Sequence, residues 1–177
     1  CRIIYHSTPH RGLDILVQVF SQVASYFFTK GIPVHLDVYS DFKIYDRPDL
    51  DYYFNSLYDK IKEHPNMTYH GSVSNNEVRE ALSNSDIFAY PSTFPETSCM
   101  CLIEAMSAGC VCVHSSLGAL PETSNNHTLM YDYTEDKMEH CTRFAETLIK
   151  AVLNYKNISV HDQKNYADTA FNIETIS

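Results

Sequence analysis

The chain has 177 residues, of which 44% are hydrophobic and 20% are charged, and its formal net charge at pH 7 is −9. A chain of this size and composition can bury a substantial core, so we expect a single domain over residues 1–177. The negative charge argues against nucleic acid or an anionic membrane as the main partner. No apolar run approaches the roughly 20 residues that a membrane-spanning helix needs, and no signal peptide is visible.

The cysteine spacing bears on metal binding and cellular location, and the first residue bears on whether the chain is part of a longer protein. Four of the six cysteines form two C-x-C pairs, Cys99 with Cys101 and Cys110 with Cys112. Zinc sites usually draw paired cysteines from a turn with two to four residues between them, so we expect structural thiols, no metal site and a cytoplasmic, reducing location. The chain begins with Cys1 rather than Met and runs directly into a strand, so we expect a fragment of a longer protein.

Strands and helices alternate along the chain. Short apolar runs between turn residues predict strands, and apolar residues at helical spacing predict helices. Ser74 and Glu77 form an S-x-x-E capping box at the start of one helix. The predicted strands are 2–7, 34–39, 67–69, 87–90, 110–114 and 128–131, and the predicted helices are 13–28, 52–62, 75–84, one that contains Glu104 and stops at Gly109, 138–154 and 160–171.

Five or six strands that alternate with helices predict an α/β fold with a doubly wound, Rossmann-like parallel sheet. If the strand order is 3-2-1-4-5-6, the first and fourth strands are neighbours at the point where the winding reverses. Ligands of such sheets bind beyond the carboxyl ends of the strands at that point. The loops there are 7–12 and 91–98, which are also the most polar of the chain.

Loop 7–12 carries groups suited to an anion. It offers hydroxyls and the cation Arg11, and Gly12 comes just before a helix N-terminus, where free N–H groups and the helix dipole attract negative charge. Taken alone, Arg11-Gly12 would fit a solvated turn equally well. The second loop also precedes a helix, so two helix ends would converge on one anion, and a diphosphate fits that arrangement better than a single phosphate. The G-x-G-x-x-G pattern of nicotinamide dinucleotide sites is missing.

Two glutamates stand eight residues apart in the segment after the fourth strand. Glu96 lies in the loop, and Glu104 lies on a helix between Leu102, Ile103, Ala105 and Met106. A carboxylate on such an apolar helix is expected to be buried, and burial without a partner costs several kcal/mol or shifts the pKa. We therefore expect a polar group, such as a hydroxyl-rich ligand, to meet Glu104.

These residues carry a family resemblance. The run from Phe94 to Gly109 resembles the E-x7-E signature of retaining GT-B glycosyltransferases of family 4, the glycosyl transferases group 1. The resemblance covers about residues 3–122, and Phe171-Asn172-Ile173-Glu174 resembles the C-terminal segment of the family. The chain looks like the C-terminal, donor-binding half of such an enzyme. Further matches in chain order are Arg11-Gly12-Leu13-Asp14, His70-Gly71-Ser72-Val73, Tyr90-Pro91-Ser92 and Gly118-Ala119-Leu120-Pro121-Glu122.

The resemblance implies catalytic and binding roles for individual side chains. Glu96 would hydrogen-bond hydroxyls of the donor sugar, and Arg11 would contact the diphosphate; these two are the candidate catalytic residues. Glu104 would hold the ribose hydroxyls, and Val73 would lie where the base packs.

The remaining donor contacts would come mainly from the backbone and from hydroxyls. Backbone N–H groups of Ser98, Cys99 and Met100 would face the sugar and the diphosphate, and Gly12 would belong to the same donor site. The family usually has a second phosphate-binding Arg in the first loop, and here Ser7 or Thr8 would substitute for it by hydrogen bonding.

The function that the resemblance implies is transfer of a sugar from a nucleoside diphosphate sugar to an acceptor hydroxyl, with retention of configuration and without a metal or cofactor. The expected partners are the nucleotide-sugar donor, an acceptor that is a glycan, lipid or protein, and the N-terminal GT-B domain of the same protein; nucleic acid is not expected. The isolated half should bind nucleotide but transfer little sugar. Two alternatives stay open: a GT-B-like nucleotide-sugar epimerase, and a non-catalytic nucleotide-binding or signalling module.

Overall fold

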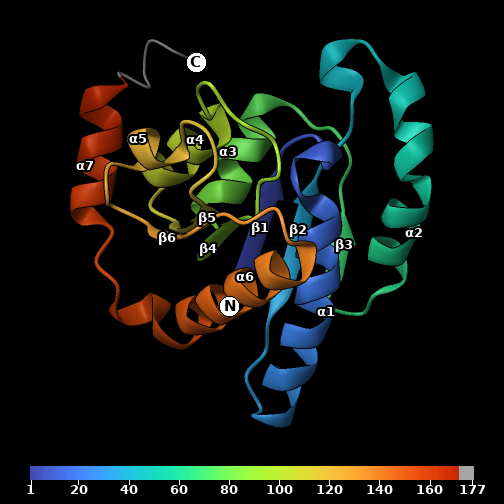
Figure 1. Ribbon diagram of the computed structural model, residues 1–177, viewed down its shortest axis with the longest axis horizontal. Coiled ribbons are helices and arrows are strands. Elements are labelled where there is room, and N and C mark those ends of the chain that lie inside the picture. The colour runs from blue at the N-terminus through green and yellow to red at the C-terminus, as the bar shows by residue number, and fades with distance from the viewer. Residues whose placement is uncertain (172–177) are drawn as a thin grey trace.

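The computed structural model describes residues 1–171, apart from the side chain of Ile44, and is built around one parallel sheet (Figure 1). The strand order is β3-β2-β1-β4-β5-β6, which confirms the predicted fold class and strand order. The central strands β1, β4 and β5 are almost entirely buried, because helices cover both faces of the sheet. The strands are β1 (Arg2–His6), β2 (His35–Tyr39), β3 (Met67–Tyr69), β4 (Ile87–Tyr90), β5 (Val111–Ser115) and β6 (Leu129–Tyr131).

The helices form two groups on opposite faces of the sheet. On one face α1 packs against α2 and α6, and on the other α4 packs against α3, α5 and α7 (Figure 1). None of the helices within residues 1–171 combines the length and apolar character needed to cross a membrane. The helices are α1 (Leu13–Thr29), α2 (Asn55–Glu63), α3 (Asn75–Ser83), α4 (Met100–Ala108), α5 (Leu120–Ser124), α6 (Lys137–Asn154) and α7 (His161–Ala170).

Most predicted boundaries agree with the structure to within about a residue, and the capping box of Ser74 and Glu77 is present at α3. The main difference lies before α2, where a 3₁₀ helix (Pro48–Phe54) occupies the start of the predicted helix. The Asp51 carboxylate holds this segment, because it accepts a hydrogen bond from the Tyr58 hydroxyl at 2.6 Å and from the Phe42 N–H at 3.2 Å. Helix α5 was not predicted, and residues 172–174 of the segment that resembles the family's C-terminal pattern lie outside the described residues.

Candidate functional site

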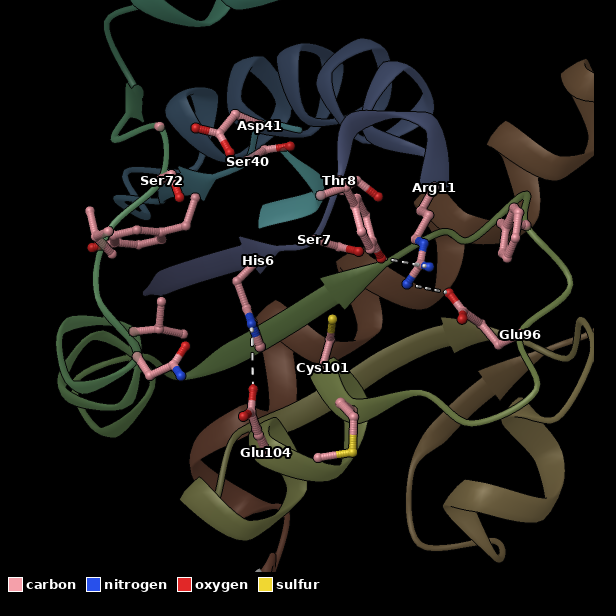
Figure 2. A pocket seen from close by; sticks show the side chains of 18 of the residues that line it. His6, Ser7, Thr8, Arg11, Ser40, Asp41, Ser72, Glu96, Cys101 and Glu104 are labelled. Carbon is pink, nitrogen blue, oxygen red and sulfur yellow. Dashed lines mark hydrogen bonds and ion pairs between the residues drawn. The ribbon is translucent and has the colours of Figure 1, made fainter. Parts of the chain in front are cut away.

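A cavity of about 460 Å³ opens beyond the carboxyl ends of the central strands. Its walls come from the last residues of β1 and β2, from the segments that follow β1, β2, β3 and β4, and from the N-terminal parts of α3 and α4 (Figure 2). This is the edge of the sheet at which the strand order predicted a ligand site. A cavity of this size, with polar groups converging on it, is suited to a small molecule.

Glu96 and Arg11 meet at one end of the cavity (Figure 2). Arg11 Nη1 lies 3.2 Å from Glu96 Oε1, and the two side chains are only 18% and 4% exposed. The same carboxylate oxygen accepts a hydrogen bond from the Tyr90 hydroxyl at 2.5 Å. The Arg11 guanidinium also lies over the Phe94 ring, 5.0 Å from its centre, and donates to the Tyr45 hydroxyl at 3.3 Å. The cation and the loop carboxylate that the sequence singled out are therefore in direct contact.

Glu104 stands at the other end, where it faces His6 at the end of β1 (Figure 2). The distance from Glu104 Oε2 to His6 Nδ1 is 3.9 Å. Burial raises the pKa of Glu104 above its usual range and lowers the pKa of His6 to about 4. His6 is therefore neutral near pH 7 and brings no positive charge, and at 3.9 Å it lies beside Glu104 without a hydrogen bond to it. Glu104 is only half-buried, with its side chain 32% exposed, because it faces the cavity, and the hydroxyl-rich partner expected for it stays a prediction.

The N-terminus of α4 opens toward the cavity. Cys99 is the N-cap residue, and its side chain makes no capping hydrogen bond, so the first N–H groups of the helix lack that partner. Met100 and Cys101 line the cavity, and Figure 2 shows the Cys101 thiol pointing toward Ser7. A hydrogen bond with Cys99, and less strongly one with Ser7, lowers the pKa of Cys101. Free N–H groups and the positive end of the helix dipole make this end of the cavity suitable for an anion.

Two glycines allow the loops around the cavity to approach one another. Gly12 has φ +101°, and a Cβ there would lie 2.1 Å from the Pro91 carbonyl oxygen. Gly118 has φ +61°, and a Cβ there would lie 2.6 Å from Glu96 N. The next residue, Ala119, donates its N–H to the Glu96 carbonyl oxygen at 2.8 Å. These contacts fix the position of the Glu96 backbone, so the direction of its carboxylate depends on the torsion angles of the side chain.

The structure gathers most of the predicted site residues around this cavity. Gly12 and Cys99 are the two that do not line it: Gly12 packs against Pro91, and Cys99 is buried, so their proposed backbone contacts stay predictions. Helix α1, all of which the structure describes, contributes nothing to the lining, whereas the N-terminal parts of α3 and α4 both line the cavity. The predicted residues that do line the cavity are Ser7, Thr8, Arg11, Val73, Glu96, Ser98, Met100 and Glu104.

Sequence reasoning missed the contributions of β1 and β2 to the lining. His6 comes just before the loop that was singled out, and Ser40 and Asp41 follow β2, so the rule of the carboxyl edge would have found all three. Buried polar atoms of this wall, Thr8 Oγ1 and Ser40 Oγ, have no hydrogen-bond partner within residues 1–171. Buried polar groups are rarely left unpaired, so these atoms are expected to find partners when a ligand or water fills the site.

Comparison with known proteins gives a family and a fold. The sequence pattern of the glycosyl transferases group 1 matches residues 2–152. No curated protein matches the chain significantly.

Three similar solved structures are considerably longer than this chain. Sucrose-phosphate synthase from Thermosynechococcus elongatus is 18% identical, with a TM-score of 0.74 over 99% of this chain and 42% of its own. Anabaena HepE, solved in complex with UDP, is 19% identical, with a TM-score of 0.69 over 99% of this chain and 46% of its own. WaaG, a glycosyltransferase involved in lipopolysaccharide biosynthesis, is 18% identical, with a TM-score of 0.68 over 95% of this chain and 42% of its own.

At these identities the solved structures show the fold, and the chain spans less than half the length of each of these three proteins. The family rests on the sequence pattern, which covers most of the chain and includes both glutamates. The architecture agrees with it, because a six-stranded parallel sheet flanked by helices is also found in halves of GT-B glycosyltransferases. The chain belongs to the glycosyl transferases group 1.

Proposed function

We propose that the cavity binds a nucleoside diphosphate sugar and that the chain is the donor-binding part of a retaining glycosyltransferase. In this pose the diphosphate lies between Arg11 and the N-terminus of α4, with Ser7 and Thr8 beside it. Glu104 holds the ribose hydroxyls, and Val73 lies against the base. Glu96 hydrogen-bonds the sugar.

One observation carries this proposal: the two ends of the cavity suit the two ends of such a donor. Arg11 and the uncapped N-terminus of α4 offer positive charge and N–H donors at one end, and the Glu104 carboxylate offers hydroxyl acceptors at the other. HepE, whose solved complex contains UDP, gives a precedent for a nucleotide in a protein of this fold.

The transfer step would depend on stabilising the departing diphosphate. Arg11 and the N–H groups of α4 would stabilise the charge that develops as the bond from the sugar to the diphosphate breaks, and Glu96 would orient the sugar. These groups supply the positive charge without a metal ion or cofactor. The acceptor hydroxyl would be held by an N-terminal GT-B domain of the same protein, so the chain alone should bind the donor and transfer little.

The electrostatics of the site predict moderate affinity. Arg11 is the one Lys or Arg among the residues that line the cavity within the described part of the chain, and Asp41, Glu96 and Glu104 line it too. Arg11 is already paired with Glu96, so an incoming diphosphate must share this guanidinium. The N–H groups of α4 therefore have a larger part in phosphate binding than they would beside two arginines.

Calorimetric titration of the 177-residue chain tests the proposal. UDP, GDP and their sugar conjugates are compared with uridine and guanosine; one diphosphate should bind, its sugar conjugate should bind more tightly, and its nucleoside should bind more weakly. A signalling module should bind none of them. Conversion of the bound nucleotide sugar to its epimer, followed without an acceptor, would instead favour an epimerase. A chain that binds none of these ligands would contradict the proposal.

A further inference from the structure

Tyr90 does not line the cavity, but it contacts Glu96, which does. Its hydroxyl donates to Glu96 Oε1 at 2.5 Å. Arg11 Nη1 uses the same oxygen, at 3.2 Å. Within residues 1–171 no donor hydrogen-bonds Oε2, although the Glu96 side chain is 4% exposed and belongs to the cavity wall. One carboxylate oxygen is thus held by the protein, and the other is left for a ligand.

The Tyr90 hydroxyl is a rigid donor. Tyr90 is the last residue of β4, has no exposed surface, and packs its ring against Tyr5 and Phe88 with centre-to-centre distances of 6.0 and 5.5 Å. In the sheet β4 lies between β1 and β5, and Tyr90 is in register with His114. Burial raises the pKa of Tyr90, so the hydroxyl keeps its proton and stays a donor.

Arg11 is the other partner of Glu96, but unlike the Tyr90 hydroxyl it also contacts other groups. Its guanidinium is shared between Glu96, the Phe94 ring and the Tyr45 hydroxyl, and the proposed diphosphate would draw on it as well. If Arg11 turned to the diphosphate, the buried Glu96 carboxylate would lose its counter-charge, and an unpaired buried carboxylate is unfavourable. The hydroxyl of Tyr90 would then be the contact that holds Glu96 in place.

We propose that Tyr90 is a positioning residue for donor-sugar recognition: its hydroxyl fixes the Glu96 carboxylate so that Oε2 faces the sugar after Arg11 engages the diphosphate. This rests on the proposed function and adds a residue to it. The backbone of Glu96 is already held by Gly118 and Ala119, so the hydrogen bond from Tyr90 sets the remaining torsions of the side chain. Tyr90 acts through Glu96 and does not touch the donor.

The test compares Tyr90→Phe with Tyr5→Phe in the 177-residue chain. Tyr5 is a matched control, since it is equally buried on the neighbouring strand β1 and its hydroxyl donates to the Thr8 carbonyl oxygen at 2.7 Å, in the first loop. For each variant, calorimetry gives the affinity for the nucleoside diphosphate and for its sugar conjugate. The ratio of the two affinities is the sugar increment. Thermal unfolding checks that both variants are folded.

Tyr90→Phe should leave the affinity for the diphosphate within about twofold and reduce the sugar increment by about fivefold to tenfold, which is the usual effect of losing one ordinary hydrogen bond, because Tyr90 acts on the sugar only through Glu96. Tyr5→Phe should change both affinities by the same factor, because Thr8 lies beside the diphosphate. An unchanged sugar increment in Tyr90→Phe, which includes the case of equal losses for the two ligands, would overturn the role of Tyr90 while leaving the proposed function standing. A wild-type chain that binds neither ligand would overturn the proposed function, and the role of Tyr90 with it.

Discussion

The chemistry of the site depends on a few charged residues in close contact. Arg11 and Glu96 form a buried pair at one end of the cavity, and Glu104 faces the neutral His6 at the other. Removing one member of a buried pair costs more than the pair itself contributes, because the remaining charge is left without compensation. Substitutions at these positions are therefore best interpreted by comparing ligands that differ in one group.

Glu104→Gln should weaken binding of the nucleoside diphosphate by about 1.5–3 kcal/mol, the usual cost of losing a charged hydrogen bond. The loss should be equal for the diphosphate and its sugar conjugate, because both carry the ribose. Glu80→Gln, on the exposed surface of α3 and away from the cavity, is the matched control and should leave both affinities unchanged. Calorimetry measures both, and unchanged affinity in Glu104→Gln would remove Glu104 from the donor site.

Arg11→Ala should weaken binding of the diphosphate by about 1.5–3 kcal/mol, the range for a hydrogen bond to a charged group, and leave binding of the nucleoside nearly unchanged. The reason is that Arg11 faces the phosphates and not the base. Arg47→Ala removes an exposed arginine, which pairs with Asp49 outside the cavity, and controls for the change in net charge. Equal losses for nucleoside and diphosphate in Arg11→Ala would show that the phosphate position is wrong.

At the scale of the elements, close contacts between loops set the shape of the site. Gly12 lets the start of α1 lie against Pro91, and Gly118 lets the loop before α5 lie against Glu96. Both glycines have positive φ, a backbone conformation that a side chain disfavours, and both leave no space for a Cβ. The glycines of the family pattern thus have a physical role here, which is to hold the loop backbones together.

Gly12→Ala should lower the free energy of unfolding by more than about 3 kcal/mol, because it adds a backbone clash to the roughly 1–2 kcal/mol cost of a left-handed Ala. Gly31→Ala is the matched control: its φ is +67°, but nothing lies within 4 Å of the added Cβ, so only the conformational cost should be seen. Urea denaturation of the two variants gives the comparison. Similar losses in both would mean that the contact of Gly12 with Pro91 is not tight in solution.

The sequence predicted the elements well where one local pattern decides them. The strands, their order and the position of the cavity follow from apolar runs and from the rules for parallel sheets. The start of α2 was missed because Asp51 holds a 3₁₀ helix through side-chain contacts with Tyr58 in α2 and Phe42 in the preceding loop, which no periodic pattern reveals. The contacts of His6 with Glu104 and of Tyr90 with Glu96 were missed for the same reason, since they depend on how separate elements pack.

At the scale of the whole molecule, buried histidines link stability to pH. His6 and His114 are buried, and burial lowers the pKa of each from 6.5 to about 4. The unfolded chain therefore takes up protons at higher pH than the folded protein does. The stability that depends on neutral histidines is fully present above pH 6.5 and is lost as the pH falls toward 4.

Lowering the pH from 7.5 to 5 should reduce the free energy of unfolding by about 2 kcal/mol for each of the two histidines. Glu104, whose pKa is raised, acts in the opposite direction and offsets part of this loss. In His114→Gln the difference between the two pH values should shrink by about 2 kcal/mol, as measured by urea denaturation at each pH. A difference as large as that of the wild-type chain would contradict a neutral, buried His114.

The central claim is that a nucleoside diphosphate lies along the carboxyl edge of the sheet, between Arg11 and Glu104. The most direct test is a titration of the isotope-labelled chain with the diphosphate that binds, followed by amide chemical shifts in NMR spectra. The largest shifts should fall on the amides of Val73, Ser98 and Met100, and those of α7, which contributes nothing to the cavity lining, should stay unchanged. Shifts confined to residues outside the cavity, or no shifts at a saturating concentration of the diphosphate, would contradict the account.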